Sequence, residues 1–341
     1  MIGISVYLSD EGAEESIIRA SLAGIKLAFT SLHIPEELGE SPERVRGLLS
    51  LFKREGFEVF ADVSKCTPVM LGLNHFEDLK ELGVTSLRLD DGFSTDDMLE
   101  LSHHFQIAIN ASTVGEKELQ HWIKSGLATE NIIAWHNFYP KPETGLDKDY
   151  FLEKQAIFDV LGIPVYAFIP GEENKRGPLN LGLPTLEDHR DQSPYVSAVQ
   201  LKRWGVLGVF VGDPGCSKDL LLKLVRFDQK KMIELTYEGN AEIEGEYQLR
   251  PDSGRDVLRM LGTRTDSDVP PINSVERKKG TITQDNDLYG RYKGELQIVR
   301  QNLERNPAVN VVGRICTEHL SLIELFQPGQ RISICRKEEL Q

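Results

Sequence analysis

Residues 27–64, LAFTSLHIPEELGESPERVRGLLSLFKREGFEVFADVS, contain the unit from which the fold of this protein is built. Two apolar runs, LAFTSLHI (27–34) and FEVFADVS (57–64), flank a stretch with helical periodicity. Ser41 followed by Pro42 predicts the start of this helix, because serine caps helix N-termini and proline suits the first helical position. The apolar residues on one face of the predicted helix are Val45, Leu48, Leu49 and Phe52. The stretch therefore predicts a strand, a helix and a second strand.

The same unit recurs from residue 1 to about residue 225. The strand-like runs are ISVYL (4–8), LAFTSLHI (27–34), FEVFADVS (57–64), VTSLRLD (84–90), QIAIN (106–110), IIAWHN (132–137), IPVYAFI (163–169) and GVLGVFVG (205–212). Further helices are predicted from Ser94 and before Gly126, which is placed to end one. Alternating strands and helices pair in parallel, and eight units close a (β/α)8 TIM barrel. An open doubly wound sheet is the alternative, weakened because no glycine-rich nucleotide motif follows any strand.

After about residue 230 the pattern changes to short strand-like runs separated by turn residues. The runs are MIELTY (232–237), GTITQD (280–285), GELQIV (294–299), NVVGRI (310–315) and RISIC (331–335). They predict a small all-β domain, either a barrel or a sandwich. The polar, proline-bearing stretch 263–280 predicts a long surface loop. The expected domains are therefore a TIM barrel over residues 1–228 and a β-domain over residues 229–341.

Composition limits the partners of this protein. Of 341 residues, 39 are basic and 53 acidic, so the formal net charge is −14. This balance argues against nucleic acid or an anionic membrane as the main partner, although local basic residues can still bind one small phosphate. The first residues lack the pattern of a signal peptide, and no window reaches about 18 apolar residues. With scattered cysteines as well, the sequence predicts a cytoplasmic protein with reduced thiols.

Polar side chains follow nearly every expected barrel strand. In barrels of this type the active site lies at the carboxyl ends of the strands, so these residues are the candidates. Carboxylates that could carry catalysis are Glu36, Asp62, Asp90 and Asp91. Side chains that could bind the substrate are His33, Arg88, Asn110, His136, Asn137, Glu143 and Asp213.

Asp90 and Asp91 are the best pair for acid–base chemistry, because one of two close carboxyl groups stays protonated more readily. Arg88 and Asp90 share a strand face that we expect to point into the barrel mouth. Neighbouring residues point to opposite faces, so both aspartates reach one ligand only if the chain turns, and Gly92 makes such a turn plausible. The alternatives are a structural Arg88–Asp90 ion pair and a solvated Asp-Asp loop.

The long loop after the seventh expected strand carries Arg176 and Arg190. Phosphate sites in barrels commonly use the loops after strands seven and eight, and arginine binds two phosphate oxygens at once. We therefore predict that these arginines bind a phosphate. The alternative is an ordinary surface loop that contains two arginines.

Several of these segments together resemble one family. They are FTSLHIPEE (29–37), ADVS (61–64), LRLDDGF (87–93), INAST (109–113), WHNFYPKPETGLD (135–147), RGPLNLGLPTLEDHR (176–190), VFVGD (209–213) and PINSVERKKGTITQDNDLYGRYKGELQI (271–298). The chain resembles the bacterial 6-phospho-N-acetylmuramidases over essentially its whole length. The resemblance implies a cytoplasmic glycoside hydrolase of peptidoglycan recycling with a cyclophilin-like C-terminal domain. Its substrate would be a small phosphorylated disaccharide, N-acetylmuramic acid 6-phosphate linked β-1,4 to N-acetylglucosamine.

Other readings of the same residues remain open. His33, Asp62, Asp90 and His136 could ligate a divalent metal in a barrel hydrolase or isomerase of a sugar phosphate, although we expect neither metal nor cofactor. Lys65 is the candidate lysine for a pyridoxal phosphate enzyme. A non-enzymatic phosphosugar-binding protein is a further alternative. The β-domain could support a homodimer or cover the barrel mouth, where Tyr289 and Arg291 would reach the substrate.

Overall fold

The computed structural model describes residues 1–33, 41–89, 92–239 and 242–337. It separates into two compact units, Met1–Val225 and Arg226–Gln341. The expected division into two domains after residue 228 concerns independent folding, and it remains a prediction.

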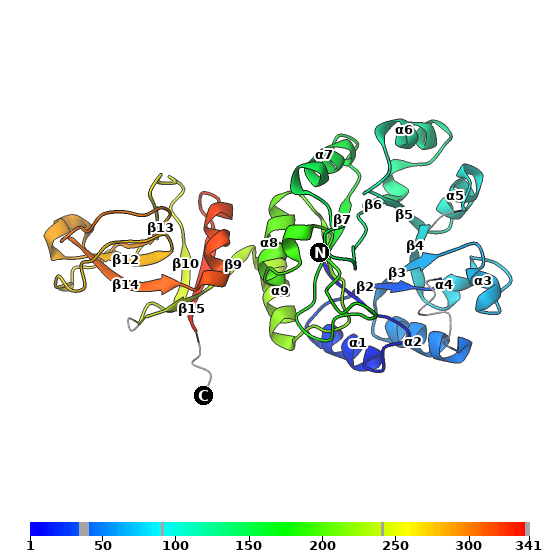
Figure 1. Ribbon diagram of the computed structural model, residues 1–341, viewed down its shortest axis with the longest axis horizontal. Helices are drawn as coiled ribbons and strands as arrows, with labels where there is room; N and C mark the ends of the chain where they lie inside the picture. The colour runs from blue at the N-terminus through cyan, green and yellow to red at the C-terminus, as the bar shows by residue number, and fades with distance from the viewer. Residues whose placement is uncertain (34–40, 90–91, 240–241, 338–341) are drawn as a thin grey trace. The chain divides into compact units, whose positions relative to one another are not determined.

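The first unit is a closed barrel whose eight parallel strands follow one another in chain order (Figure 1). The strands are β1 (Ile2–Ser5), β2 (Leu27–Ser31), β3 (Glu58–Val63), β4 (Val84–Leu89), β5 (Gln106–Asn110), β6 (Ile132–Trp135), β7 (Val165–Ile169) and β8 (Gly208–Val211). The helices are α1 (Ala13–Leu22), α2 (Pro42–Arg54), α3 (Thr67–Met70), α4 (Asp78–Glu81), α5 (Thr95–Ser102), α6 (Glu116–Lys124), α7 (Lys148–Asp159), α8 (Pro194–Arg203) and α9 (Lys218–Lys230). The prediction of a TIM barrel is confirmed.

Local signals in the sequence set the helix ends. The Ser41 side chain accepts a hydrogen bond from the Arg44 backbone N–H at 3.2 Å, which caps α2. Ser94 and Asp97 form a capping box at the start of α5. Gly126 adopts a φ of +112° directly after α6, a conformation that disfavours other residues. These signals fix the starts of α2 and α5 and the end of α6.

Aromatic side chains fill the barrel interior. The ring of Trp135 lies 4.5 Å from that of Phe210 and 5.1 Å from that of Phe60, centroid to centroid. Gly3 provides the space for this packing, because a Cβ there would lie 2.2 Å from the Phe210 ring. The other members of this core are Leu27, Phe29, Ala108, Ile133, Tyr166 and Phe168. The centre of the barrel is therefore solid, and ligands can bind only at its ends.

The second unit is a seven-stranded, mostly antiparallel sheet with the order β10-β15-β9-β14-β12-β13-β11. The strands are β9 (Met232–Glu238), β10 (Gly245–Gln248), β11 (Val257–Arg259), β12 (Thr281–Asp285), β13 (Leu296–Val299), β14 (Val309–Ile315) and β15 (Arg331–Arg336). Only β9 and β15 pair in parallel within this sheet of described residues. The five predicted strands are confirmed, whereas β10 and β11 were not predicted. Residues 263–280 contain no helix or strand, as expected for a surface loop.

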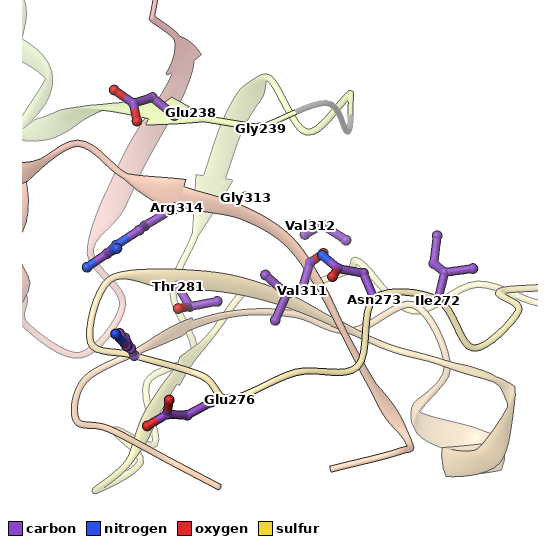
Figure 2. A pocket seen from close by; sticks show the side chains of 11 residues that line it. Glu238, Gly239, Ile272, Asn273, Glu276, Thr281, Val311, Val312, Gly313 and Arg314 are labelled. Carbon is purple, nitrogen blue, oxygen red and sulfur yellow. The ribbon is translucent and has the colours of Figure 1, made fainter. Parts of the chain in front are cut away.

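A pocket of about 710 Å³ opens in the second unit beside β14 (Figure 2). There β14 pairs with the end of β9 at Arg314 and Ile315, while the Val311 N–H donates to the Asn273 carbonyl at 3.2 Å. Figure 2 shows Glu238 and Glu276 on different sides of this pocket, with Arg314 on the strand between them. Because carboxylates and basic side chains alternate around it, the pocket has no single charge preference.

No helix in the described ranges is both long enough and apolar enough to cross a membrane.

Candidate active site at the carboxyl ends of the barrel strands

A buried charged cluster lies at the carboxyl ends of β2, β3, β4 and β6. The Arg88 Nη1 donates to Asp62 Oδ1 at 3.1 Å, and its Nη2 donates to the Asn137 side-chain oxygen. The Asp62 Oδ2 lies 3.8 Å from His33 Nδ1. The side chains of Arg88 and Asp62 are 13% and 8% exposed, so both charges are largely removed from water. Three predicted substrate-binding residues and one predicted catalytic carboxylate therefore meet in one place.

Strand register brings this cluster together. Asp62 on β3 lies directly opposite Arg88 on β4. Asp62 follows Phe60 of the barrel core by two residues and shares its face, so Arg88, which lies opposite Asp62, also points to the inner side of the barrel. A buried ion pair of this kind stabilises a fold weakly, because desolvation offsets most of the attraction. The Asp62–Arg88 pair lies at the carboxyl ends of the strands, which is where barrels of this type bind their ligands.

Ser112 connects the carboxyl ends of β5 and β6 through hydrogen bonds. Its Oγ accepts a hydrogen bond from the Asn137 backbone N–H at 3.0 Å, and its own N–H donates to the Asn110 side chain at 3.0 Å. Tyr139 also hydrogen-bonds Ser112, and burial raises the pKa of its phenol above the ordinary value. Ser112 follows the fifth expected strand among the polar strand-end residues, whereas Tyr139, in the WHNFYPKPETGLD segment, was not predicted as a site residue. Asn110 and Asn137 are thus fixed by neighbours, with partly exposed side chains.

His136 points away from this cluster, although its Nδ1 lies 3.3 Å from Ser112 Oγ. Trp135 points into the barrel, so His136 points outward, where its ring lies 4.5 Å from that of Phe151 on α7. The imidazole is fully buried, and burial lowers its pKa to about 3. The structure therefore does not place His136 where it could contact a ligand at the barrel mouth, in contrast to Asn137.

Asp213 organises the long loop between β7 and α8. Its carboxylate is 1% exposed and accepts backbone N–H bonds from Gly171 at 2.8 Å, Arg176 at 3.0 Å and Leu183 at 3.1 Å. The Arg176 guanidinium lies over the Tyr7 ring at 3.9 Å, at the end of β1. Asp213 thus acts on the loop backbone, and the loop presents Arg176 at the barrel end.

Arg190 has a different environment from Arg176. It is 7% exposed, and its Nε donates to Glu187 at 2.6 Å. Its other nitrogens donate to Glu187 and to the carbonyls of Leu181, Gly182, Tyr139 and Lys141. Because all its donor nitrogens are engaged, Arg190 clamps two loops together and is not arranged to bind a phosphate. Glu143, with φ +69°, is exposed and donates its N–H to Glu187 at 2.9 Å.

Three predicted catalytic residues, Glu36, Asp90 and Asp91, lie outside the described residues. Lys65, the alternative Schiff-base lysine, forms an ion pair with Asp97 at 2.7 Å. Within the described ranges, no group of three or more His, Cys, Asp or Glu side chains could hold a metal ion. Tyr289 and Arg291 are exposed on the second unit.

Comparisons with known proteins identify relatives of the whole chain. A conserved protein of unknown function from Enterococcus faecalis shares 33% identity and a TM-score of 0.87, with 99% of this chain and 96% of that chain covered. An uncharacterized B. cereus protein shares 27% identity and a TM-score of 0.81, with 98% and 99% covered. No protein with curated annotation matches. Family models described as 6-phospho-N-acetylmuramidase, N-terminal and C-terminal, match residues 2–226 and 225–335. The chain therefore belongs to the 6-phospho-N-acetylmuramidase family.

Proposed function

We propose that this protein is a glycoside hydrolase that cleaves the β-1,4 bond between N-acetylmuramic acid 6-phosphate and N-acetylglucosamine. Membership of a family named for a glycosidase supports the reaction class. The observation that carries the proposal is the desolvated Asp62–Arg88–Asn137 cluster at the carboxyl ends of the barrel strands. We further propose that the enzyme acts in the cytoplasm during peptidoglycan recycling, with a cyclophilin-like C-terminal unit that supports a homodimer.

Arg176 is the residue that we assign to the phosphate. The Tyr7 ring supports its guanidinium at 3.9 Å, and Asp213 holds its backbone N–H at 3.0 Å. A guanidinium with a fixed orientation binds two phosphate oxygens with little further ordering. Arg190 is less suited to this role, because its nitrogens donate to Glu187 and to backbone carbonyls. The sequence does not distinguish the two arginines. We assign Arg176 to the phosphate and Arg190 to holding two loops together.

Catalysis needs a proton donor at the leaving oxygen and a group that stabilises the anomeric carbon. The substrate carries a 2-acetamido group, whose carbonyl oxygen can attack that carbon while the donor protonates the leaving sugar. Water then opens the cyclic intermediate and returns the proton. We propose that Asp90 and Asp91, which follow β4 in the chain, supply the acid and the carboxylate that orients the amide. Glu36, Asp62 and Glu143 are the substitutes.

Asp62 suits the anionic role better than that of the acid. Arg88 pairs with it at 3.1 Å, and a neighbouring cation favours the ionised form of a carboxyl group. We propose that Asp62 and Arg88 bind the sugar hydroxyls together with His33, Asn110 and Asn137. Partly exposed amide groups such as those of Asn110 and Asn137 can donate to, and accept from, the same sugar.

Mass spectrometry of reaction products tests the proposal. The purified protein is incubated with the phosphorylated disaccharide and with its dephosphorylated form, each with and without a chelator. We expect cleavage of the phosphorylated disaccharide alone, unaffected by the chelator. Loss of activity with the chelator would favour the metal-dependent alternative. Binding of the disaccharide without cleavage would favour the non-enzymatic one.

Variants then assign the roles. Asp90→Asn and Asp91→Asn should each lower kcat at least about 100-fold, the usual scale for an acid–base group. Asp256→Asn is the matched control, since Asp256 is paired with Arg255 at 2.8 Å on the second unit. Near-normal turnover in both single variants would remove Asp90 and Asp91 from the mechanism. Glu36, Asp62 and Glu143 would then be tested in the same way.

A further inference from the structure

The chain segments that follow β3 and β4, including α3, the residues before α4 and part of α5, line a pocket of about 320 Å³ in the barrel unit. We call it the Phe76–Phe93 pocket, because these two rings lie 5.8 Å apart at an interplanar angle of 59° in its wall. Its volume is at the lower end of the range for small-molecule sites, which are roughly 300–1,000 Å³. One sugar ring is a ligand of suitable size.

The pocket combines apolar faces with polar groups. Phe76 and Phe93 are half-buried, and Val69 beside them is 79% exposed, so water contacts apolar surface that a ligand could cover. Asn74 and Glu100 also line the pocket. A pyranose ring has C–H faces that pack against aromatic rings, while its hydroxyls hydrogen-bond amides and carboxylates. The lining therefore fits an uncharged sugar better than a wholly apolar or an anionic ligand.

The walls of the pocket are held in place before any ligand binds. Lys65 pairs with Asp97 at 2.7 Å and lies over the Phe93 ring at 5.9 Å. Hydrogen bonds from Lys65 and Ser94 lower the pKa of Asp97 to about 2, so this ion pair persists at neutral pH. On the other wall, Asp78 accepts the backbone N–H of Asn74 at 3.0 Å. A preformed site loses little conformational entropy on binding.

The position of the pocket relates it to the proposed reaction. Arg176 lies over Tyr7 after β1, whereas the Phe76–Phe93 pocket is lined by segments that follow β3 and β4, two and three strands further around the closed barrel. A barrel of this type is roughly 15 Å across, from the strand spacing and tilt. Lys65 follows Asp62 by three residues, which limits their Cα separation to roughly 11 Å. The leaving-group sugar of a disaccharide bound at Asp62 can therefore extend towards this pocket.

We propose that the Phe76–Phe93 pocket binds the N-acetylhexosamine on the leaving-group side of the scissile bond. This inference rests on the proposed function for the orientation of the substrate. The pocket adds a specificity site to the candidate catalytic cluster, because it selects the leaving group by its sugar face. Arg176 selects the other sugar by its phosphate.

Kinetics with two leaving groups test the proposal. The substrates are the phosphorylated disaccharide and the β-glycosyl fluoride of N-acetylmuramic acid 6-phosphate, whose leaving group is too small to use the pocket. Phe93→Ala and Phe76→Ala should each lower kcat/KM at least about tenfold on the disaccharide, the scale of one aromatic contact, and less than about threefold on the fluoride. Phe93→Tyr keeps the aromatic face and should restore the activity.

Phe326→Ala is the matched control, since Phe326 is a half-buried phenylalanine of the second unit. Equal losses on both substrates, or no loss on either, would overturn the assignment of the pocket.

Saturation-transfer NMR with free N-acetylglucosamine separates this inference from the proposed function. We expect ligand signals with the wild-type protein and with Phe326→Ala, and their loss in the Phe76→Ala/Phe93→Ala double variant. If the wild-type protein cleaves neither substrate, the proposed function fails, while this binding measurement still decides whether the pocket takes a sugar. Absence of signals with the wild-type protein, or signals unchanged in the double variant, would overturn the sugar site.

Discussion

Arg176 and Arg190 lie in the same loop and have different environments. Arg176 stacks on one aromatic ring, whereas Arg190 bridges Glu187 and four backbone carbonyls while 7% exposed. A buried arginine with its donors engaged stabilises the fold, and removing it leaves several carbonyls unpaired. A stacked, partly exposed arginine contributes less to folding and is better suited to contact a ligand.

This difference predicts distinct effects of two alanine substitutions. Arg176→Ala should raise KM about 10- to 100-fold for the phosphorylated disaccharide and leave the dephosphorylated form unchanged, because a charge-assisted hydrogen bond contributes about 1.5–3 kcal/mol. Arg190→Ala should lower the free energy of unfolding by about 3 kcal/mol or more and impair both substrates equally. Steady-state kinetics and thermal unfolding measure these effects. A selective KM effect of Arg190→Ala would contradict the assignment.

Two buried histidines predict a loss of stability in acid. Burial lowers the pKa of His136 to about 3 and that of His189 to about 4, from an ordinary value of 6.5. As pH falls below 6.5, these histidines become protonated in the unfolded chain but stay neutral in the folded protein. The stability present at neutral pH is therefore lost towards pH 4. Each histidine should cost about 1.4 kcal/mol per pH unit in this interval.

Thermal unfolding between pH 7 and pH 4.5 measures this dependence. The decline in Tm should become shallower in His136→Asn and His189→Asn, even where the substitution lowers Tm at neutral pH. His121→Gln is the control, because His121 is exposed on α6. An equally steep decline in all three variants would assign the acid sensitivity to other groups.

Residue-level prediction depends on knowing the strand faces and the register. Alternation along β4 predicts that Arg88 points into the barrel, but its partner Asp62 follows from the β3–β4 register, which the sequence does not encode locally. The same alternation separates His136 from Asn137, although residue type alone groups them. Arg176 and Arg190 cannot be distinguished without the loop path, because their partners include distant carbonyls such as that of Tyr139.

At the scale of elements, one carboxylate fixes the long loop between β7 and α8. Asp213 follows β8 and accepts N–H bonds from three separate points of this loop, at Gly171, Arg176 and Leu183. Such charge-assisted bonds contribute about 1.5–3 kcal/mol each when buried. The loop that carries Arg176 is therefore ordered by a side chain that need not touch the substrate.

Asp213→Asn should loosen this loop, because the new amide would present N–H groups to backbone N–H groups. We expect faster tryptic cleavage after Lys175 and Arg176, and a raised KM for the phosphorylated disaccharide. Limited proteolysis followed by mass spectrometry measures the first effect. Asp219→Asn is the control, since Asp219 is 76% exposed in its ion pair with Lys223 and such pairs contribute little. Identical cleavage rates in both variants would rule out this role.

Strands were predictable where their sequence is distinctive. The eight barrel strands are apolar runs bounded by helix signals, and each is found. In contrast, β10 (GEYQ) and β11 (VLR) are short and lack alternation of apolar and polar residues. They are strands because β15 and β13 offer them backbone partners. Tertiary pairing therefore determines these elements, and local propensity does not.

At the scale of the whole molecule, each unit contains a core of its own. The barrel unit is filled by aromatic residues such as Trp135 and Phe210, and the second unit buries Ile233, Tyr237 and Ile332 in its sheet. The helix α9 begins in the barrel unit, and its last residues, 226–230, belong to the second unit. There Arg226 forms an ion pair with Glu234 at 2.9 Å. A fragment boundary at the end of this helix therefore leaves both cores intact.

Separate cores predict that the two units fold independently. A fragment of residues 1–230 keeps α9 whole and should unfold cooperatively, with the near-ultraviolet circular dichroism of a packed aromatic core, because the whole barrel cluster lies within it. A fragment ending at residue 217 lacks α9, exposes the barrel surface that Leu221 and Leu224 cover, and should aggregate. Thermal unfolding of both fragments beside the full chain makes the comparison. If the 1–230 fragment lacked a cooperative transition while the full chain showed a single one, the barrel would depend on the second unit for its stability.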